Sequence, residues 1–367
     1  MPKLIYCLGL ILAVVSPGAA ATLQVGPGYT YATLAAAVSA SSAGDTILMH
    51  GGPAGYTYTD QVATIGKALT ITGVNDGFGL PTFNQTPGTE LSNFKGYLIV
   101  RADVTLSNLV FENAAITDGN GGNAAGIRQE AGNLTVLDSQ FINNQNGILS
   151  TPGVDGTGSL TVIGSLFSGN GSGTGLTHAI YANRLASLTV NNGVFTGTNI
   201  GHDIKSRAAN NFINGNSLDD GVTGTTSYAI DLPNGGNATI ANNTITQGNN
   251  TNNGTMIAYG SEGLIWGSNA ASITGNSFTN FNPGDQTVGV KNFADSGTNL
   301  SVTGNNFCGL VYDVQGPATV SGNTSSPGPC NIPAPPLGLA WAAGLALLGL
   351  VRRGVLIPAV KSFERGC

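Results

Sequence analysis

The sequence predicts an all-β solenoid, a long domain of short strands that repeat along the chain. An apolar residue followed five positions later by a second, usually large, apolar residue returns every 23 to 33 residues. Only 9% of the 367 residues are charged, and 55 glycines separate short β-branched runs, as in chains of many strands and turns. Repeats that keep their core positions and vary in their loops are typical of solenoids. The pairs are Leu106/Phe111, Val136/Phe141, Val162/Phe167, Val190/Phe195, Ile213/Leu218, Ile240/Ile245, Ile273/Phe278 and Val302/Phe307.

Residues 1–21 have the pattern of a secretory signal peptide. Lys3 gives a positive start, residues 4–15 form an apolar run, and the alanines at 19–21 offer a small-residue cleavage site. The alternative is a membrane-spanning helix, for which this apolar run is short.

The start of the mature chain predicts a helical cap over one end of the solenoid. We expect a strand at 23–25, a helix over 31–40 and a second strand over 44–49. A cap is expected because an open end would expose apolar side chains and unpaired strand edges.

A second strand in each turn is marked by an isoleucine: Ile127, Ile148, Ile180, Ile204, Ile230 or Ile257. If these isoleucines stack inside the coil, their neighbours point outward, because strand side chains alternate between the two faces. The outward positions then form two columns along the solenoid. The first column is Arg128, Leu149, Tyr181, Lys205, Asp231 and Ala258, and the second is Glu130, Thr151, Asn183, Arg207, Pro233 and Gly260.

The chain resembles the right-handed parallel β-helix proteins of the pectate-lyase-like superfamily. The resemblance covers residues 22–328 and depends on the N-terminal cap, the Gly-Asp-Thr-Ile strand at 44–47 and turns such as Ile-Thr-Gly-Asn-Ser-Phe at 273–278. It implies a right-handed parallel β-helix with an N-terminal helical cap. This fold is used by lyases, epimerases, hydrolases, phage tailspikes and adhesins, so the resemblance implies no single function.

One stretch concentrates charge in a chain that has little of it. Asp203, Lys205 and Arg207 lie within five positions, with Tyr181 and Asp231 on the neighbouring turns. Such a group on the outer face of a parallel sheet suits an acidic polysaccharide laid across the turns, because guanidinium groups pair with carboxylates.

These residue types also predict β-elimination or C5-epimerisation at a uronate. Arg207 would neutralise the sugar carboxylate and so acidify the adjacent proton, Lys205 would remove that proton, and Tyr181 would protonate the leaving glycosidic oxygen. The roles resemble those of Lys, Arg and Tyr in β-helix polysaccharide lyases and epimerases. The expected substrate-binding residues are Asp203, Asp231, Asn183 and Tyr259.

The alternative is a surface charge ladder, in which the charged residues neutralise one another and each exposed pair contributes roughly 0–1 kcal/mol. This alternative predicts that Lys205 pairs with Asp231, which would spoil the lysine as a base. His178 and His202 each precede an isoleucine of the series by two residues, and we expect a hydrogen-bonded ladder in the core from this pair.

The composition limits which partners and cofactors we expect. The net charge of −6 comes without a basic stripe, so no nucleic-acid partner is expected. No cofactor is expected either; Ca²⁺ is the one candidate metal, and no motif supports it. Cys308 and Cys330 either form a disulfide near the last turns or remain free thiols.

The C-terminal region has three parts: a Pro-rich segment at 329–336, an apolar run at 337–351 and a basic tail at 352–367. Together they resemble PEP-CTERM-type sorting signals of Gram-negative bacteria, with Ile-Pro-Ala-Pro-Pro in place of Val-Pro-Glu-Pro. The resemblance implies an exosortase-like membrane protease as a partner, and a secreted or cell-surface location with a C-terminal membrane helix. A plain membrane anchor is the alternative.

Two functions follow from the sequence. The first is binding of an acidic extracellular polysaccharide, with cleavage by β-elimination or epimerisation as its catalytic form. The second is a non-catalytic structural or adhesive protein of the surface or matrix. Concentrated charge favours the first, and the sorting-like C-terminus favours the second.

Overall fold

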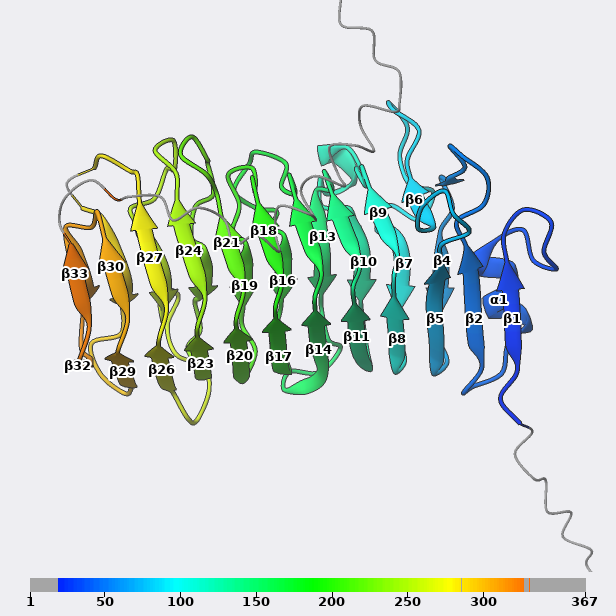
Figure 1. Ribbon diagram of the computed structural model, residues 1–367. Coiled ribbons are helices and arrows are strands. Elements are labelled where there is room, and N and C mark those ends of the chain that lie inside the picture. Colours follow the sequence, from blue (N-terminus) through cyan, green and yellow to red (C-terminus); the bar gives the residue numbers. More distant parts are fainter. Residues whose placement is uncertain (1–18, 285, 327–329, 331–367) are drawn as a thin grey trace, which may run out of the picture. The chain divides into compact units, whose positions relative to one another are not determined.

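The computed structural model describes residues 19–284, 286–326 and 330. These residues form a right-handed parallel β-solenoid of about 11 turns, which confirms the predicted fold class. Figure 1 shows the strands stacked side by side along one axis in an elongated body.

Three parallel sheets, here named A, B and C, form the walls of the solenoid. Sheet A contains β1 (Thr22–Val25), β2 (Thr46–His50), β5 (Leu69–Val74), β8 (Val104–Ser107), β11 (Asn133–Leu137), β14 (Thr157–Ile163), β17 (Leu185–Asn191), β20 (Asn210–Asn214), β23 (Asn237–Ala241), β26 (Ala270–Thr274), β29 (Asn299–Thr303) and β32 (Thr319–Ser321). Sheet B contains β3 (Tyr58–Thr59), β6 (Thr82–Asn84), β9 (Val110–Glu112), β12 (Gln140–Ile142), β15 (Leu166–Ser168), β18 (Val194–Thr196), β21 (Ser217–Asp219), β24 (Thr244–Gln247), β27 (Ser277–Asn280), β30 (Asn306–Cys308) and β33 (Thr324–Ser326). Sheet C contains β4 (Ala63–Ile65), β7 (Gly96–Val100), β10 (Ala125–Gln129), β13 (Asn146–Ser150), β16 (Ile180–Ala182), β19 (Ile204–Ser206), β22 (Ile230–Leu232), β25 (Thr255–Tyr259), β28 (Val288–Asn292) and β31 (Tyr312–Gln315).

The repeating apolar pairs form the core, as the spacing predicts. Val136 pairs with Val162 in sheet A, and Phe141 pairs with Phe167 in sheet B. The rings of Phe141, Phe167 and Phe195 are stacked, with 4.7 Å between successive centroids. Each turn therefore repeats the buried contacts of the turn before it, which fixes the register of all three sheets.

A ladder of buried asparagines joins sheets A and B. The side-chain amide of Asn243 donates to Oδ1 of Asn276 at 2.9 Å, and that of Asn276 donates to Oδ1 of Asn305 at 3.0 Å. The residue before each of these asparagines takes the left-handed conformation that turns the chain, with a φ of 55° at Asn242, 66° at Gly275 and 65° at Gly304. These asparagines therefore connect each turn of the solenoid to the next through side-chain hydrogen bonds.

Helix α1 (Leu34–Ala40) is shorter than the predicted helix over 31–40. The hydroxyl of Thr33 caps it by accepting the backbone N–H of Ala36 at 3.2 Å, and Leu34, Ala37 and Val38 are buried. The role of α1 as a cap over the end of the solenoid stays a prediction. The 3-10 helix η1 (Asp118–Asn120) lies in the connection between β9 and β10.

The predicted location at a membrane is corrected by the structure. Within the described ranges, no helix is long and apolar enough to cross a membrane. Helix α1 has seven residues, whereas a spanning helix needs about 20. The predicted apolar run at 337–351 and tail at 352–367 lie outside the described residues, as do 1–18 of the predicted signal peptide and all of 329–336 except Cys330.

Cys308 and Cys330 form a disulfide, with their Cα atoms 5.7 Å apart. It ties residue 330 to the end of strand β30. Of the two alternatives for these cysteines, the structure therefore has the bridged one.

Candidate functional site

The isoleucine series of sheet C lies in register, one residue above the next. Ile180 pairs with Ile204, Ile204 with Ile230, and Ile230 with Ile257. All four are fully buried. The outward residues between them are consequently stacked as well, with Tyr181 paired to Lys205 and Lys205 paired to Asp231.

Arg207 is the most extensively bound cation of this outer face. Its Nε donates to the hydroxyl oxygen of Tyr181 at 2.9 Å, and its terminal NH1 donates to Oδ1 of Asn234 at 2.5 Å. The same NH1 lies 2.6 Å from Oε2 of Glu262. Burial opposes the charge, but the hydrogen bond to Glu262 and the nearby Tyr181 outweigh it and raise the pKa of Arg207.

Lys205 lies between two carboxylates. Its Nζ is 3.2 Å from Oδ2 of Asp231 and 3.3 Å from Oε1 of Glu262. Asp231 is almost fully buried, and this burial raises the pKa of its carboxyl, with Lys205 acting in the opposite direction. The pairing of Lys205 with Asp231 is the arrangement that the charge-ladder alternative predicts, and the free base form of Lys205 would give up both ion pairs.

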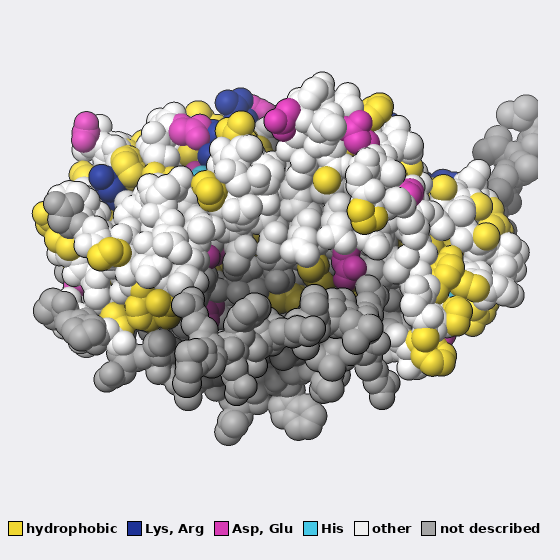
Figure 2. Space-filling view, turned by 90° about the horizontal axis from the view of Figure 1, so that it is seen from above, with side chains coloured by type: hydrophobic (Ala, Val, Ile, Leu, Met, Phe, Trp, Pro, Cys, Tyr) yellow, Lys and Arg dark blue, Asp and Glu magenta, His cyan; other side chains and the backbone are white. Residues whose placement is uncertain are grey.

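The residues named here the Arg207 cluster are Tyr181, Lys205, Arg207, Asp231 and Glu262. Glu262 is the exposed member, with 44% of its side chain accessible, whereas the side chains of Lys205 and Arg207 are 13% and 16% accessible. Two cations are thus held in place beneath one exposed carboxylate. Charged side chains are sparse on the face seen in Figure 2, where they are scattered among uncharged ones.

His178 and His202 form a ladder beneath the Arg207 cluster, as predicted. Their rings are stacked, with centroids 4.7 Å apart, and Nδ1 of His178 accepts the backbone N–H of His202 at 3.1 Å. Nδ1 of His202 in turn accepts the backbone N–H of Tyr228 at 3.1 Å. Burial, followed by nearby Lys205, lowers the pKa of His202 to about 3, so this pair serves as neutral core groups.

The structure does not bring Asp203 and Tyr259 to the Arg207 cluster. The carboxyl of Asp203 is buried and accepts the hydroxyl of Thr198 at 2.6 Å. Burial raises the pKa of Asp203 to about 8, so the carboxyl is protonated at neutral pH. Tyr259 is 1% exposed and donates its hydroxyl to the carbonyl of Gly236 at 2.5 Å. Neither residue contacts the outer face, so neither can touch a ligand there.

Asn183 keeps its predicted place. It directly follows β16, as Arg207 directly follows β19, so the two lie on neighbouring turns and both are partly accessible. Sequence reasoning missed Asn234 and the ion pairs of Glu262. Both residues come from turns that follow sheet C strands, and no local pattern links Glu262 to a lysine 57 residues earlier.

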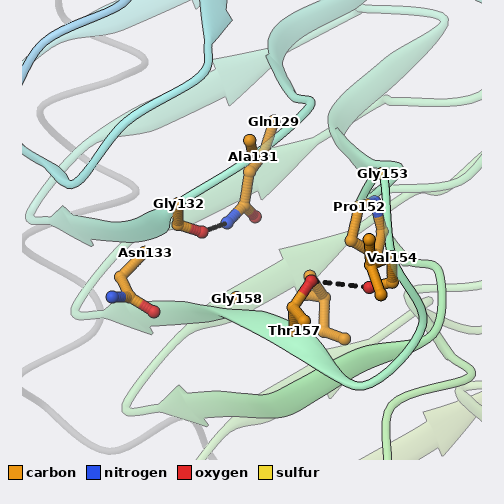
Figure 3. Close-up of a pocket in the computed structure, with 10 residues that line it drawn as sticks. Gln129, Ala131, Gly132, Asn133, Pro152, Gly153, Val154, Thr157 and Gly158 are labelled. Carbon is orange, nitrogen blue, oxygen red and sulfur yellow. Dashed lines mark hydrogen bonds between the residues drawn. The ribbon is translucent and has the colours of Figure 1, made fainter.

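A hollow on the neighbouring surface contains none of these residues. It lies between the ends of β10 and β13 and the starts of β11 and β14, and Figure 3 shows its lining, which includes Gln129, Gly132 and Thr157. Gln129 donates to the carbonyl of Gly132 at 2.8 Å, so its amide is already bound. No charged side chain lines the hollow. In the part of the chain that the structure describes, no three His, Cys, Asp or Glu side chains are placed to hold a metal.

No protein-family model and no curated protein matches the chain. Among solved structures, an alginate lyase from Paenibacillus sp. str. FPU-7 is similar at 14% identity and a TM-score of 0.43, covering 83% of this chain and 99% of the lyase. The pectin methylesterase from Aspergillus niger has 12% identity and a TM-score of 0.33, covering 89% of this chain and 96% of its own. The A-module of a mannuronan C-5 epimerase from Azotobacter vinelandii has 11% identity and a TM-score of 0.31, covering 82% and 92%. Scores this low transfer no activity and no residue role to this chain.

Proposed function

We propose that the outer face of sheet C around the Arg207 cluster binds an acidic polysaccharide through its carboxylate groups. The observation that supports this proposal most is the pair of fixed cations, Arg207 and Lys205, whose shared partner is the exposed carboxylate of Glu262. A chain with few charges thus keeps two partly accessible cations side by side on one sheet.

Glu262 indicates how a ligand carboxylate would be held. One of its oxygens lies against NH1 of Arg207 and the other against Nζ of Lys205. A uronate carboxylate has the same two oxygens and the same charge, so it would take this place when the Glu262 side chain moves aside. Charge-assisted hydrogen bonds from a guanidinium are among the stronger polar contacts in proteins, and they favour planar carboxylates.

Binding to polyuronates tests the proposal. We expect the protein to bind alginate or polygalacturonate and not an uncharged polysaccharide such as dextran, with affinity that falls as salt rises. Arg207→Ala should lose this binding, and Arg184→Ala, which removes an exposed arginine paired with Asp155, should keep it. Equal binding of dextran and polyuronate, or unchanged binding by Arg207→Ala, would contradict the proposal.

Eliminative cleavage or epimerisation is a second candidate, and one contact favours it. Nε of Arg207 donates to the oxygen of Tyr181, so the phenolic proton is free to point towards a ligand. In elimination, a base takes the C5 proton of the uronate, the electron pair forms the C4–C5 double bond, and Tyr181 gives its proton to the departing O4 oxygen. In epimerisation, a proton returns to C5 from the opposite face instead.

Lys205 is stacked on Tyr181 in the next turn, and to act as the base it must first give up a proton while it lies between Asp231 and Glu262. Incubation with polyuronate should then yield the ultraviolet absorbance of an unsaturated uronate, and epimerisation should change the NMR spectrum of the polymer. Binding without either product would support a non-catalytic carbohydrate-binding protein. No binding at all would support the structural or adhesive alternative.

A further inference from the structure

A second group of cations lies on sheet C, around Glu130. Lys95 Nζ is bonded to Oε1 of Glu130, Arg101 Nε lies 2.8 Å from Oε2, and Arg128 Nε lies 3.9 Å from Oε1. We call these four residues the Glu130 cluster. Arg101 and Lys95 expose 52% and 41% of their side chains, whereas Arg128 and Glu130 are mostly buried.

Three cations face one carboxylate in this cluster, so it carries a surplus of two positive charges in a chain whose net charge is −6. Both oxygens of Glu130 are already engaged by Lys95 and Arg101. Nε of Arg128 is buried and has no hydrogen-bond partner among the described residues. The positive charge of this buried donor is thus incompletely compensated, and the exposed side chains of Lys95 and Arg101 carry the part of the surplus charge that a ligand can reach.

The pKa of Arg128 also indicates a cation with too little compensating negative charge. Burial lowers the pKa of its guanidinium, and the nearby charge of Glu130 offsets only part of this effect. The guanidinium is thus a partly desolvated cation that lacks a full counter-charge, in contrast to Arg207, whose partners include Glu262 and Asn234.

The Glu130 cluster shares its face and its columns with the Arg207 cluster. Arg128 pairs with Leu149, Leu149 pairs with Tyr181, and Tyr181 pairs with Lys205. Figure 1 shows the corresponding strands β10, β13, β16 and β19 in succession along the axis. With about 4.8 Å between neighbouring strands, three steps place the two clusters about 14 Å apart.

Residues of the second column connect the clusters. Glu130 follows Arg128 by two positions, as Arg207 follows Lys205, and Thr151 and Asn183 hold the same place on the two turns between. Thr151 and Asn183 are partly accessible, while Leu149 is 5% exposed. A ligand that joins the clusters would therefore pass over the polar second column.

We propose that the Glu130 cluster is a second binding site for a carboxylate of the same polysaccharide, so that one chain runs along the solenoid axis and contacts both clusters. This inference depends on the function proposed above. The carboxylate of Glu130 already sits among the three cations, which indicates that they are spaced for this group. Two sites on one ligand raise its affinity only when the ligand is long enough to reach both.

The chain length of the ligand provides the test. Affinities of uronate disaccharides and decasaccharides are measured for the wild type, Arg101→Ala, Arg128→Ala and Arg207→Ala, with Arg184→Ala as the control for loss of an exposed arginine. We expect Arg101→Ala and Arg128→Ala to weaken decasaccharide binding by about tenfold and to leave the disaccharide unaffected. Arg207→Ala should weaken both ligands. Thermal unfolding of each variant checks the fold, and Arg101→Ala, whose side chain is half exposed, keeps the test valid if Arg128→Ala unfolds.

The outcomes separate the two proposals. Equal decasaccharide affinity for the wild type and Arg101→Ala, while Arg207→Ala loses binding, would overturn the second site and leave the first. Equal wild-type affinity for the two chain lengths would overturn it as well. No binding of either oligosaccharide by the wild type would overturn the proposed function, and the second site with it.

Discussion

Replacing Glu262 by glutamine should strengthen binding of a polyuronate. Glu262 forms ion pairs with Lys205 at 3.3 Å and with Arg207 at 2.6 Å, and a ligand carboxylate must displace it from both. Because the side chain of Glu262 is 44% exposed, each pair is expected to contribute about 0.2–1 kcal/mol. Removing both therefore lowers the cost of displacement by roughly 0.5–2 kcal/mol, which corresponds to about a 2- to 30-fold gain in affinity.

The assay is calorimetric titration of wild type and Glu262→Gln with a uronate decasaccharide at low ionic strength. Asp118→Asn, at an exposed position of η1, changes the net charge equally and serves as the control. The gain should appear in Glu262→Gln alone and should shrink as salt is added. Equal gains in both variants would show a general charge effect, and weaker binding by Glu262→Gln would show that Glu262 supports the ligand instead of competing with it. Either result refutes the reasoning.

Three further predictions concern the same region. Tyr181→Phe removes the acceptor of the 2.9 Å hydrogen bond from Arg207, so polyuronate affinity should fall about 2- to 12-fold. Unchanged affinity in the same titration would show that Tyr181 does not position Arg207. Ile204→Ala opens a cavity in the fully buried isoleucine series and should lower the free energy of unfolding in denaturant by about 2–5 kcal/mol, whereas Phe212→Ala, at a side chain 48% exposed, should lower it much less. Asp203 has its pKa raised from 3.8 to about 8, so the folded state holds a proton that the unfolded state releases, and stability falls as pH rises through this range. Above about pH 7 His178 and His202 are neutral in both states, and there Asp203→Asn should reduce the fall in the free energy of unfolding with pH, which reaches up to about 1.4 kcal/mol per pH unit in the wild type; identical slopes for variant and wild type would contradict the burial of an acid at this position.

The fold was predictable because every turn repeats the same physical requirement. Phe167 must cover the ring of Phe141, and Ile204 must cover Ile180, so the spacing of apolar residues in the sequence carries the register of the sheets. From that register the stacking of Tyr181, Lys205 and Asp231 followed directly.

The site was predictable only where strand alternation applies. Strand β19 begins at Ile204, so Asp203 lies in the connection before the strand, where alternation does not apply. Its carboxyl accepts the hydroxyl of Thr198 and does not reach the outer face. Tyr259 lies two residues after the inward-facing Ile257 of β25, so the same alternation turns its ring into the core. Glu262 reaches the site from the loop after β25, and the conformation of such a loop cannot be read from a periodic pattern in the sequence.

Binding of polygalacturonate and of its fully methyl-esterified form tests the central claim most directly, because the two polymers share a backbone and differ in carboxylate charge. If Arg207 and Lys205 recognise carboxylates, wild-type protein binds the free acid and not the ester, and Arg207→Ala binds neither. Equal binding of acid and ester by the wild type would contradict carboxylate recognition on sheet C.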